Sequence, residues 1–336
     1  VYQLMAVKQQ TPELLQQAKT LLMLPDYFGF RLTGNKLSEY TNGSTTQLVN
    51  PDTFQWDKEL IRKLGYPEDI FLPLQMPGTK VGQLLPEIQK EVGFDLEVVL
   101  CGSHDTASAV MAVPQTEGDG IYISSGTWSL MGIESLKPVI TEDAAAANFT
   151  NEGGYDHRFR FLKNIMGLWM IQSVRHEYND AYSFAQLCDM AEESKEFPSR
   201  VDVNDQSFLS PDSMVEAIRQ YCHKTGQPVP ESVGELTSVV YRSLAQSYGE
   251  TVRGLEKIAG KTYDSIHIIG GGSNAAYLNQ LTADATGKTV YAGPGEATAI
   301  GNLLAQMIHA GDLADLKSAR KCVRESFEIK TFAPAK

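Results

Sequence analysis

The sequence predicts an α/β protein of two domains, and three features indicate this. Short apolar segments typical of buried strands, such as residues 266–269, alternate along the chain with segments of helical periodicity. Strands that alternate with helices favour layered α/β folds. The 336 residues are more than one domain of ordinary size needs, and they can bury a large core without a disulfide or metal.

The first third of the chain is expected to contain helices and loops before its first clear strand. Residues 11–13 (Thr-Pro-Glu) are typical of a helix start, and leucines at helical spacing follow as far as Leu22. Residues 34–53 are rich in Gly, Asn, Thr and Pro, which indicates loops. The apolar run at 97–101 predicts a buried strand, and the small residues of 106–113 predict a helix packed closely behind it.

A turn-rich segment, residues 114–120 (Pro-Gln-Thr-Glu-Gly-Asp-Gly), predicts a domain boundary. We therefore expect one domain over 1–113 and a second over 114–336. The elements expected in the second are a β-hairpin over 121–133, helices over 164–175 and from 210, a long amphipathic helix over 235–259, a strand over 266–269, a helix through Leu281, a strand over 289–292 and a helix over 296–309.

Charge and cysteine content exclude several classes of protein. The formal net charge is −12 and the isoelectric point is about 5.0, which argues against a nucleic-acid or anionic-membrane binder. The 4 cysteines form no C-x-x-C pair, so neither a zinc site nor a disulfide framework is predicted. Reduced thiols, no signal peptide and no apolar run long enough to span a bilayer together predict a cytoplasmic protein.

Two glycine- and hydroxyl-containing loops are candidate phosphate cradles. Residues 124–129 (Ser-Ser-Gly-Thr-Trp-Ser) form the expected hairpin tip, where free amides and hydroxyls can hold phosphate oxygens; an ordinary polar turn is the alternative. Gly270-Gly271-Gly272 ends a strand and lets the backbone approach a ligand closely, although it can also be a simple tight turn. No acid ends the next strand, so a dinucleotide site is not expected there.

Residues 102–106 (Gly-Ser-His-Asp-Thr) are the candidate catalytic segment. They follow the expected strand at 97–101, and α/β sheets place ligands at the carboxyl ends of their strands. Asp105 is either a helix N-cap or a base that accepts a proton from a substrate hydroxyl, with His104 beside it as a hydrogen-bonding partner. Asn164 and Gln172 fall on one expected helix, eight residues apart, where both could contact a long ligand.

Taken together, the motifs resemble those of the FGGY family of carbohydrate kinases, and within it the members that act on L-rhamnulose. The resemblance runs in order along almost the whole chain, and its most specific strings are Ser-His-Asp-Thr-Ala-Ser-Ala-Val at 103–110 and Ser-Ser-Gly-Thr-Trp-Ser-Leu-Met-Gly at 124–132. Further matches are Leu-Pro-Asp-Tyr-Phe at 24–28, Arg-Leu-Thr-Gly at 31–34, Glu-Tyr-Thr-Asn at 39–42, Thr-Gln-Leu-Val-Asn at 46–50, Asn-Glu-Gly-Gly at 151–154, Leu-Lys-Asn-Ile-Met-Gly-Leu-Trp at 162–169 and the triple glycine.

The resemblance implies the actin-like, ribonuclease-H-like ATPase fold, with ATP in a cleft between two domains. It implies phosphoryl transfer from Mg²⁺·ATP to O1 of L-rhamnulose, with Asp105 as the general base. The residues that it implies at the sugar are His104, Asp105, Thr106 and Asn164. Those that it implies at ATP are Thr127, Gln172 and Gly271, with Ser125, Gly126, Gly270, Gly272 and Asn274 as weaker candidates.

The family's first phosphate motif, an Asp-x-Gly-type hairpin near the N-terminus, is not found in these 336 residues, which open on Val1. We therefore expect a further N-terminal segment in the gene product, and little activity from this chain by itself. Two other hypotheses remain open. One is an FGGY kinase for another ketose, such as L-fuculose or D-xylulose, and the other is a non-catalytic sugar- or nucleotide-binding protein on the same scaffold.

Overall fold

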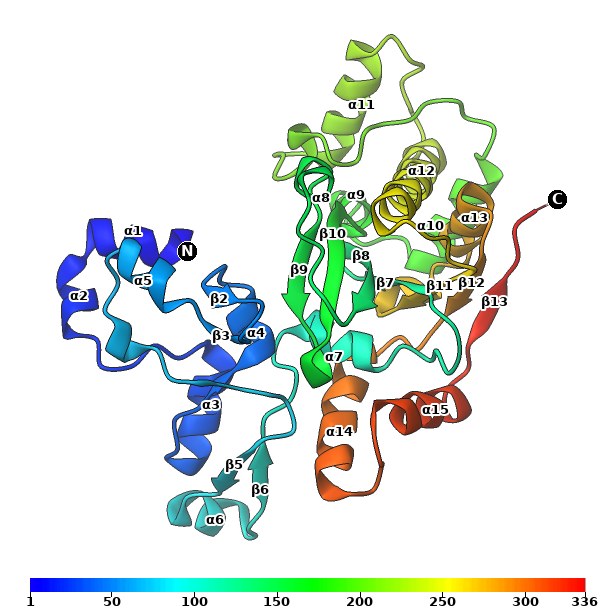
Figure 1. The fold of residues 1–336 in the computed structure, drawn as a ribbon. Helices are drawn as coiled ribbons and strands as arrows, with labels where there is room; N and C mark the ends of the chain where they lie inside the picture. Colours follow the sequence, from blue (N-terminus) through cyan, green and yellow to red (C-terminus); the bar gives the residue numbers. More distant parts are fainter. Residues whose placement is uncertain (336) are drawn as a thin grey trace.

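The computed structural model describes residues 1–335, which fold into a smaller part near the N-terminus and a larger part built on a mixed β-sheet (Figure 1). The smaller part, drawn in blue and cyan, lies beside the larger part, drawn in green to red. Helix α7 joins the two and packs against the larger part. None of the helices within residues 1–335 has the length and apolar character needed to cross a membrane.

The smaller part consists of short elements around its own apolar core. Its helices are α1 (Tyr2–Gln10), α2 (Pro12–Gln17), α3 (Leu24–Thr33), α4 (Tyr40–Ser44), α5 (Lys58–Lys63) and α6 (Pro86–Val92). Its strands are β1 (Ser38–Glu39), β2 (Val49–Asn50), β3 (Gln55–Trp56), β4 (Leu74–Gln75), β5 (Lys80–Gln83) and β6 (Glu97–Val99), paired as β1–β4, β2–β3 and β5–β6. Tyr40, Trp56 and Ile61 are among the buried residues of this core.

The larger part contains a seven-stranded sheet in the order β13-β12-β11-β7-β8-β10-β9. Strands β12, β11 and β7 are parallel, and the remaining pairs are antiparallel. The strands are β7 (Ile121–Ser125), β8 (Trp128–Ser135), β9 (Thr150–Gly153), β10 (Phe159–Met166), β11 (Ser265–Ile269), β12 (Thr289–Ala292) and β13 (Lys330–Phe332). The hairpin β7–β8, the strand β11 and the strand β12 confirm the sequence prediction.

Helices cover both faces of this sheet. They are α7 (Asp105–Met111), α8 (Glu142–Ala146), α9 (Trp169–Glu177), α10 (Phe184–Glu193), α11 (Met214–Lys224), α12 (Val233–Ala259), α13 (Ala276–Thr286), α14 (Ala297–Ala310) and α15 (Leu316–Ser326). Because side chains alternate along a strand, Ile121 and Ile123 of β7 face the core under α9 to α13, whereas Tyr122 faces the core with α7, α14 and α15. The predicted amphipathic helix is α12, which begins with a capping box between Ser232 and Glu235.

The prediction of a strand at 97–101 is correct for residues 97–99, but the prediction that it is buried is wrong. Residues 97–99 do form β6, but it pairs antiparallel with β5 in a two-stranded sheet and is only half-buried. The helix predicted from residue 11 is also shorter than expected, because α2 ends at Gln17 and the following leucines lie outside it. In both places the apolar run is short. Its periodicity is therefore too brief to show where the helix ends or with which strand the segment pairs.

The helix predicted over 164–175 forms only in its second half, and its predicted start is wrong. Residues 159–166 form strand β10, and the helix α9 begins only at Trp169. Between them, a Cβ on Gly167 would lie 2.5 Å from the carbonyl carbon of Trp128, so the chain turns there in close contact with the β7–β8 hairpin. Asn164 and Gln172 therefore occupy different elements and do not share a helix face.

Candidate functional site

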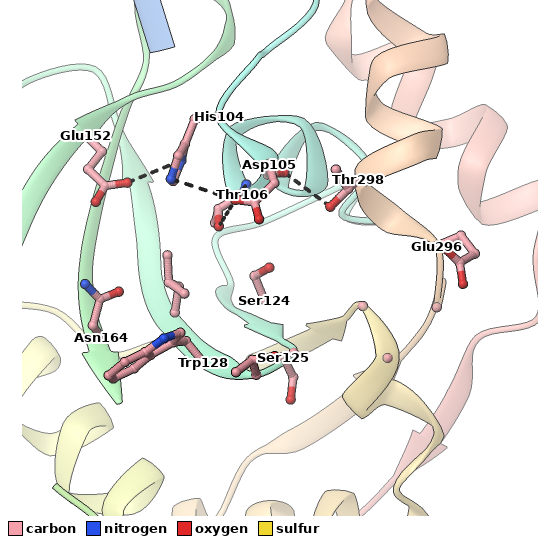
Figure 2. Close-up of a pocket in the computed structure, with 16 residues that line it drawn as sticks. His104, Asp105, Thr106, Ser124, Ser125, Trp128, Glu152, Asn164, Glu296 and Thr298 are labelled. Carbon is pink, nitrogen blue, oxygen red and sulfur yellow. Dashed lines mark hydrogen bonds and ion pairs between the residues drawn. The ribbon is translucent and has the colours of Figure 1, made fainter. Parts of the chain in front are cut away.

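A cavity of about 630 Å³ lies where the N-terminus of α7 meets the carboxyl ends of the parallel strands β7 and β11 (Figure 2). Parallel strands end at the same edge of a sheet, and open α/β sheets bind ligands there. The predicted site residues that line it are His104, Asp105, Thr106, Ser125, Gly126, Thr127, Asn164, Gly270 and Gly271. Gln172, Gly272 and Asn274 are not in its lining.

The three glycines after β11 have different positions in the site. A Cβ on Gly270 would lie 2.9 Å from the Ser125 carbonyl oxygen, and one on Gly272 would lie 1.9 Å from Ser125 Oγ. These two glycines therefore let the β11 loop pack directly on the end of β7. A Cβ on Gly271 would meet no heavy atom within 4 Å, so its backbone is open toward the cavity.

The start of α9 stabilises the hairpin tip between β7 and β8 through backbone hydrogen bonds. The amides of Leu168 and Trp169 donate to the carbonyl oxygens of Gly126 and Thr127 at 3.0 and 3.1 Å. Thr127 Oγ1 also donates to Gln172 Oε1 at 3.5 Å. The structure thus brings two of the predicted ATP residues together, across two elements instead of along one helix.

Asp105 is the first residue of α7 and points into the cavity (Figure 2). Its side chain is 78% exposed, and Oδ1 accepts hydrogen bonds from the amide and hydroxyl of Thr106 at 2.6 and 3.2 Å. The N-cap position belongs to His104, which makes no side-chain capping bond. The N-cap alternative for Asp105 is therefore wrong, and its carboxylate is available to a ligand.

A buried carboxylate, Glu39, holds the loop that carries Asp105. Its side chain accepts the Ser103 amide at 3.1 Å and the Ser103 hydroxyl at 2.6 Å, together with donors from Thr41 and Asn42. The Thr41 hydroxyl in turn accepts the His104 amide at 3.3 Å. Burial raises the pKa of Glu39, and these hydrogen bonds oppose that rise. The loop is thus positioned by this network and not by a strand of the central sheet.

Strand β10 contributes the wall opposite α7. Alternate residues of a strand face the same side, so Arg160, Leu162 and Asn164 all face the side that carries α7. This alternation explains how Asn164 reaches the cavity, although it lies on strand β10 and not on the predicted helix. Burial lowers the pKa of His104, as does Arg160, whereas Glu152 and Asp105 act in the opposite direction.

Seven further residues complete the lining. Ser124 and Trp128 belong to the predicted phosphate loop and Leu130 to the motif around it, although none was named as a site residue, and Glu152, Gly295, Glu296 and Thr298 were not predicted. Glu152 lies inside the quoted Asn-Glu-Gly-Gly string, so the motif held a signal for it. Glu296 and Thr298 precede and open α14, and only the folding of that helix onto α7 brings them to the cavity; Thr298 Oγ1 donates to the Asp105 carbonyl oxygen at 3.3 Å.

The donor set of the cavity fits a magnesium ion carried by a polyphosphate. The described lining holds three carboxylates, those of Asp105, Glu152 and Glu296, and no lysine or arginine. A polyanion would be repelled there unless a cation accompanies it. Within residues 1–335 no group of three or more His, Cys, Asp or Glu side chains could hold a metal alone. Mg²⁺ usually binds through one or two carboxylates, water and substrate phosphates, which matches such a site.

Two family descriptions match most of this chain. The "FGGY family of carbohydrate kinases, C-terminal domain" matches residues 121–310, and the "FGGY family of carbohydrate kinases, N-terminal domain" matches residues 1–112. A rhamnulokinase of Halalkalibacterium halodurans is 51% identical over 100% of this chain and 71% of its own length. A rhamnulokinase of Bacillus subtilis (strain 168) is 45% identical over 99% of this chain and 68% of its own length.

Solved structures show the same architecture at much lower sequence identity. A ligand-bound xylulose kinase from Lactobacillus acidophilus matches with a TM-score of 0.77 at 18% identity, over 99% of this chain and 67% of that one. A glycerol kinase from Plasmodium falciparum with ADP matches with a TM-score of 0.74 at 15% identity, over 99% and 67%. The fold is therefore the actin-like ATPase fold of sugar kinases. The chain belongs to the FGGY family of carbohydrate kinases.

Proposed function

We propose that this protein transfers the γ-phosphoryl group of ATP to O1 of L-rhamnulose, giving L-rhamnulose 1-phosphate. The observation that carries this proposal is the exposed carboxylate of Asp105 in one cavity with the open backbone of Gly271 and the hydroxyls of Ser124 and Thr127. A sugar hydroxyl beside Asp105 and the phosphate oxygens of ATP beside Gly271, Ser124 and Thr127 would be placed for direct transfer. The choice of L-rhamnulose rests on the names of the relatives reported above.

Asp105 acts as the general base in the proposed mechanism. Its carboxylate accepts the proton of the O1 hydroxyl as that oxygen attacks the γ-phosphorus, and the bond to the bridging oxygen of ATP breaks. Thr106 holds Oδ1 by two hydrogen bonds and so orients the carboxylate. His104, next to Asp105, and Asn164, on the opposite wall, bind other oxygens of the ketose.

The two loops of the sheet edge bind the nucleotide. Thr127 and the amides of the hairpin tip contact phosphate oxygens, with the backbone of Gly271 on the other side and Gln172 supporting Thr127 from α9. Ser125, Gly270 and Gly272 maintain the spacing of these loops, and Asn274 lies in the short turn that follows. Mg²⁺, when bound with ATP, supplies positive charge that offsets the phosphates, and Asp105 and Glu296 are the carboxylates that would hold its water shell.

The domain division also remains a proposal. A boundary at 114–120 is supported by the family matches, which end at 112 and resume at 121. With that division, His104, Asp105 and Thr106 come from the first domain and the rest of the lining from the second, so closure of the domains would exclude water from the reacting groups. We place the protein in the cytoplasm, with ATP and a ketose as its ligands.

The function is tested by measuring sugar-dependent ADP release by the full-length gene product. Mg²⁺·ATP is supplied with L-rhamnulose, L-fuculose, D-xylulose or no sugar, and ADP is measured in each case. Release selective for L-rhamnulose is expected. Selective release with another ketose would replace the substrate but keep the kinase. Nucleotide binding without sugar-dependent release would overturn the kinase proposal in favour of a binding protein.

Replacing Thr127 with Ala is expected to raise the KM for ATP by about tenfold, because one hydroxyl contact to the phosphates is lost. The KM for the ketose should change little. Steady-state kinetics with each substrate varied in turn measures both values. Thr331→Ala, on the exposed strand β13, is the matched control and should leave both unchanged. An unaltered KM for ATP in Thr127→Ala would contradict the assignment.

A further inference from the structure

Arg160 is a buried arginine that contacts the histidine of the candidate sugar site. Its side chain is fully buried on β10, and Nε donates to the Gly153 carbonyl oxygen at 3.0 Å. Nη2 lies 3.0 Å from Glu152 Oε2 and 3.0 Å from His104 Nδ1. A buried charge of this kind is costly unless it is paired, and here Glu152 pairs it.

The contact with Arg160 determines where the proton of His104 resides. A guanidinium carries only hydrogen-bond donors, so Nδ1 of His104 must accept, and the proton of the neutral ring is on Nε2. Glu152 Oε2 is farther from Nδ1, at 3.6 Å, and its charge is shared with Arg160. Burial and Arg160 both lower the pKa of His104, which agrees with a neutral ring.

The protonated nitrogen faces the reacting group. His104 Nε2 lies 3.8 Å from Asp105 Oδ1, too far for a direct hydrogen bond, and both residues line the cavity (Figure 2). An oxygen of the ketose placed between them can accept from Nε2–H while its neighbour donates to Asp105. With the other tautomer, Nε2 would present a lone pair and would compete with Asp105 for the same hydroxyl proton.

We propose that Arg160 is a positioning residue that keeps the proton of His104 on Nε2, so that His104 donates a hydrogen bond to a ketose oxygen beside Asp105. The histidine's role at the sugar rests on the proposed function, whereas the tautomer itself does not. The charged and titratable groups that face the ring are Arg160 and Glu152 from the sheet and Asp105 from its own loop.

The tautomer can be measured directly, without turnover, by NMR of the protein labelled with ¹⁵N in histidine. In the wild type, Nδ1 of His104 is expected to have the shift of an unprotonated ring nitrogen and Nε2 that of a protonated one. Arg160→Met leaves Glu152 as the partner of Nδ1 and should move the proton to Nδ1. Arg160→Lys keeps a donor there and should restore part of the wild-type pattern. A wild-type spectrum with Nδ1 protonated would overturn the proposal, whatever the variants do.

Kinetics adds a result that a merely structural role would not produce. Arg160→Met should raise the KM for the ketose about tenfold, the value of one hydrogen bond, with a smaller change in kcat. Loss of Arg160 removes a positive neighbour, so the pKa of His104 should rise in the variant. Below that pKa both ring nitrogens carry protons and donation persists; above it Nε2 loses its proton, and the KM should climb with pH. A pH-independent loss would contradict the proposal.

Two further variants distinguish loss of the Arg160–His104 contact from misfolding and from a general effect of removing an arginine. Glu152→Gln replaces the competing carboxylate with a neutral, weaker acceptor and should leave Nδ1 unprotonated, which keeps the proposal testable even if Arg160→Met does not fold. Arg158→Met, two residues before Arg160 on the chain and outside the cavity, is the matched control and should change neither the spectrum of His104 nor the KM. Wild-type protein with the Nε2 tautomer but no activity on any ketose would overturn the proposed function alone.

Discussion

Asp105→Asn is expected to reduce the kcat for ketose phosphorylation by at least ~10²-fold, the usual scale for loss of a general base. The amide cannot accept the O1 proton, whereas its oxygen can still accept the two hydrogen bonds from Thr106. The fold and the KM for ATP should therefore be retained. Steady-state kinetics together with a thermal melt measures all three quantities.

The control for this variant is Asp143→Asn. Asp143 is also an exposed aspartate in the first turn of a short helix, α8, but it is not part of the cavity lining. A change of charge at a helix N-terminus alone should alter stability by less than about 1 kcal/mol and leave kcat unchanged. An Asp105→Asn enzyme with nearly normal kcat would show that another group takes the proton.

The second large effect is expected at Gly301, where helix α14 crosses α7. A Cβ on Gly301 would lie 1.8 Å from the Ser108 carbonyl oxygen and 2.4 Å from its carbonyl carbon. Because both are backbone atoms, no side chain can rotate away, and the two helices must separate. We expect Gly301→Ala to lower the free energy of unfolding by about 3 kcal/mol, at the upper end of the usual cost of overpacking.

The same change should affect the site as well as stability. Thr298, one turn earlier on α14, donates to the carbonyl oxygen of Asp105, so displacing α14 moves the loop that carries the base. Denaturant unfolding measures the stability, and kcat measures the displacement. Gln306→Ala, an exposed site on the same helix, is the control and should stay within about 0.5 kcal/mol of wild type. An equally stable Gly301→Ala would contradict the close approach of the two helices.

Some elements could be predicted because their signals are local. The hairpin β7–β8 consists of two short, largely apolar runs on either side of a Gly-Thr turn, and α12 has a capping box and a long apolar face. Each needs only its own residues to be identified. The hydroxyl- and glycine-rich loops at the ends of β7 and β11 were found for the same reason, and parallel pairing then brings them to one edge.

Other elements could not be predicted because their identity depends on distant partners. Residues 159–166 have aromatic and aliphatic residues at alternating positions but also fit a helix start, and pairing with β8 and β9 makes them a strand. The apolar run at β6 has the composition of a central strand, yet it pairs with β5 outside the main sheet. Asn164 reached the predicted site through a different element from the one expected.

The sequence by itself determined the α/β class, the family motifs and the identity of Asp105 as the candidate base, since these depend on residue type and order along the chain. Only the tertiary structure decided how that base is held. Glu39 precedes Ser103 by 64 residues, and Arg160 follows His104 by 56. Whether a carboxylate is buried, or which imidazole nitrogen carries a proton, depends on groups that folding brings within about 3 Å. The local sequence cannot show these contacts, because the groups are far apart along the chain.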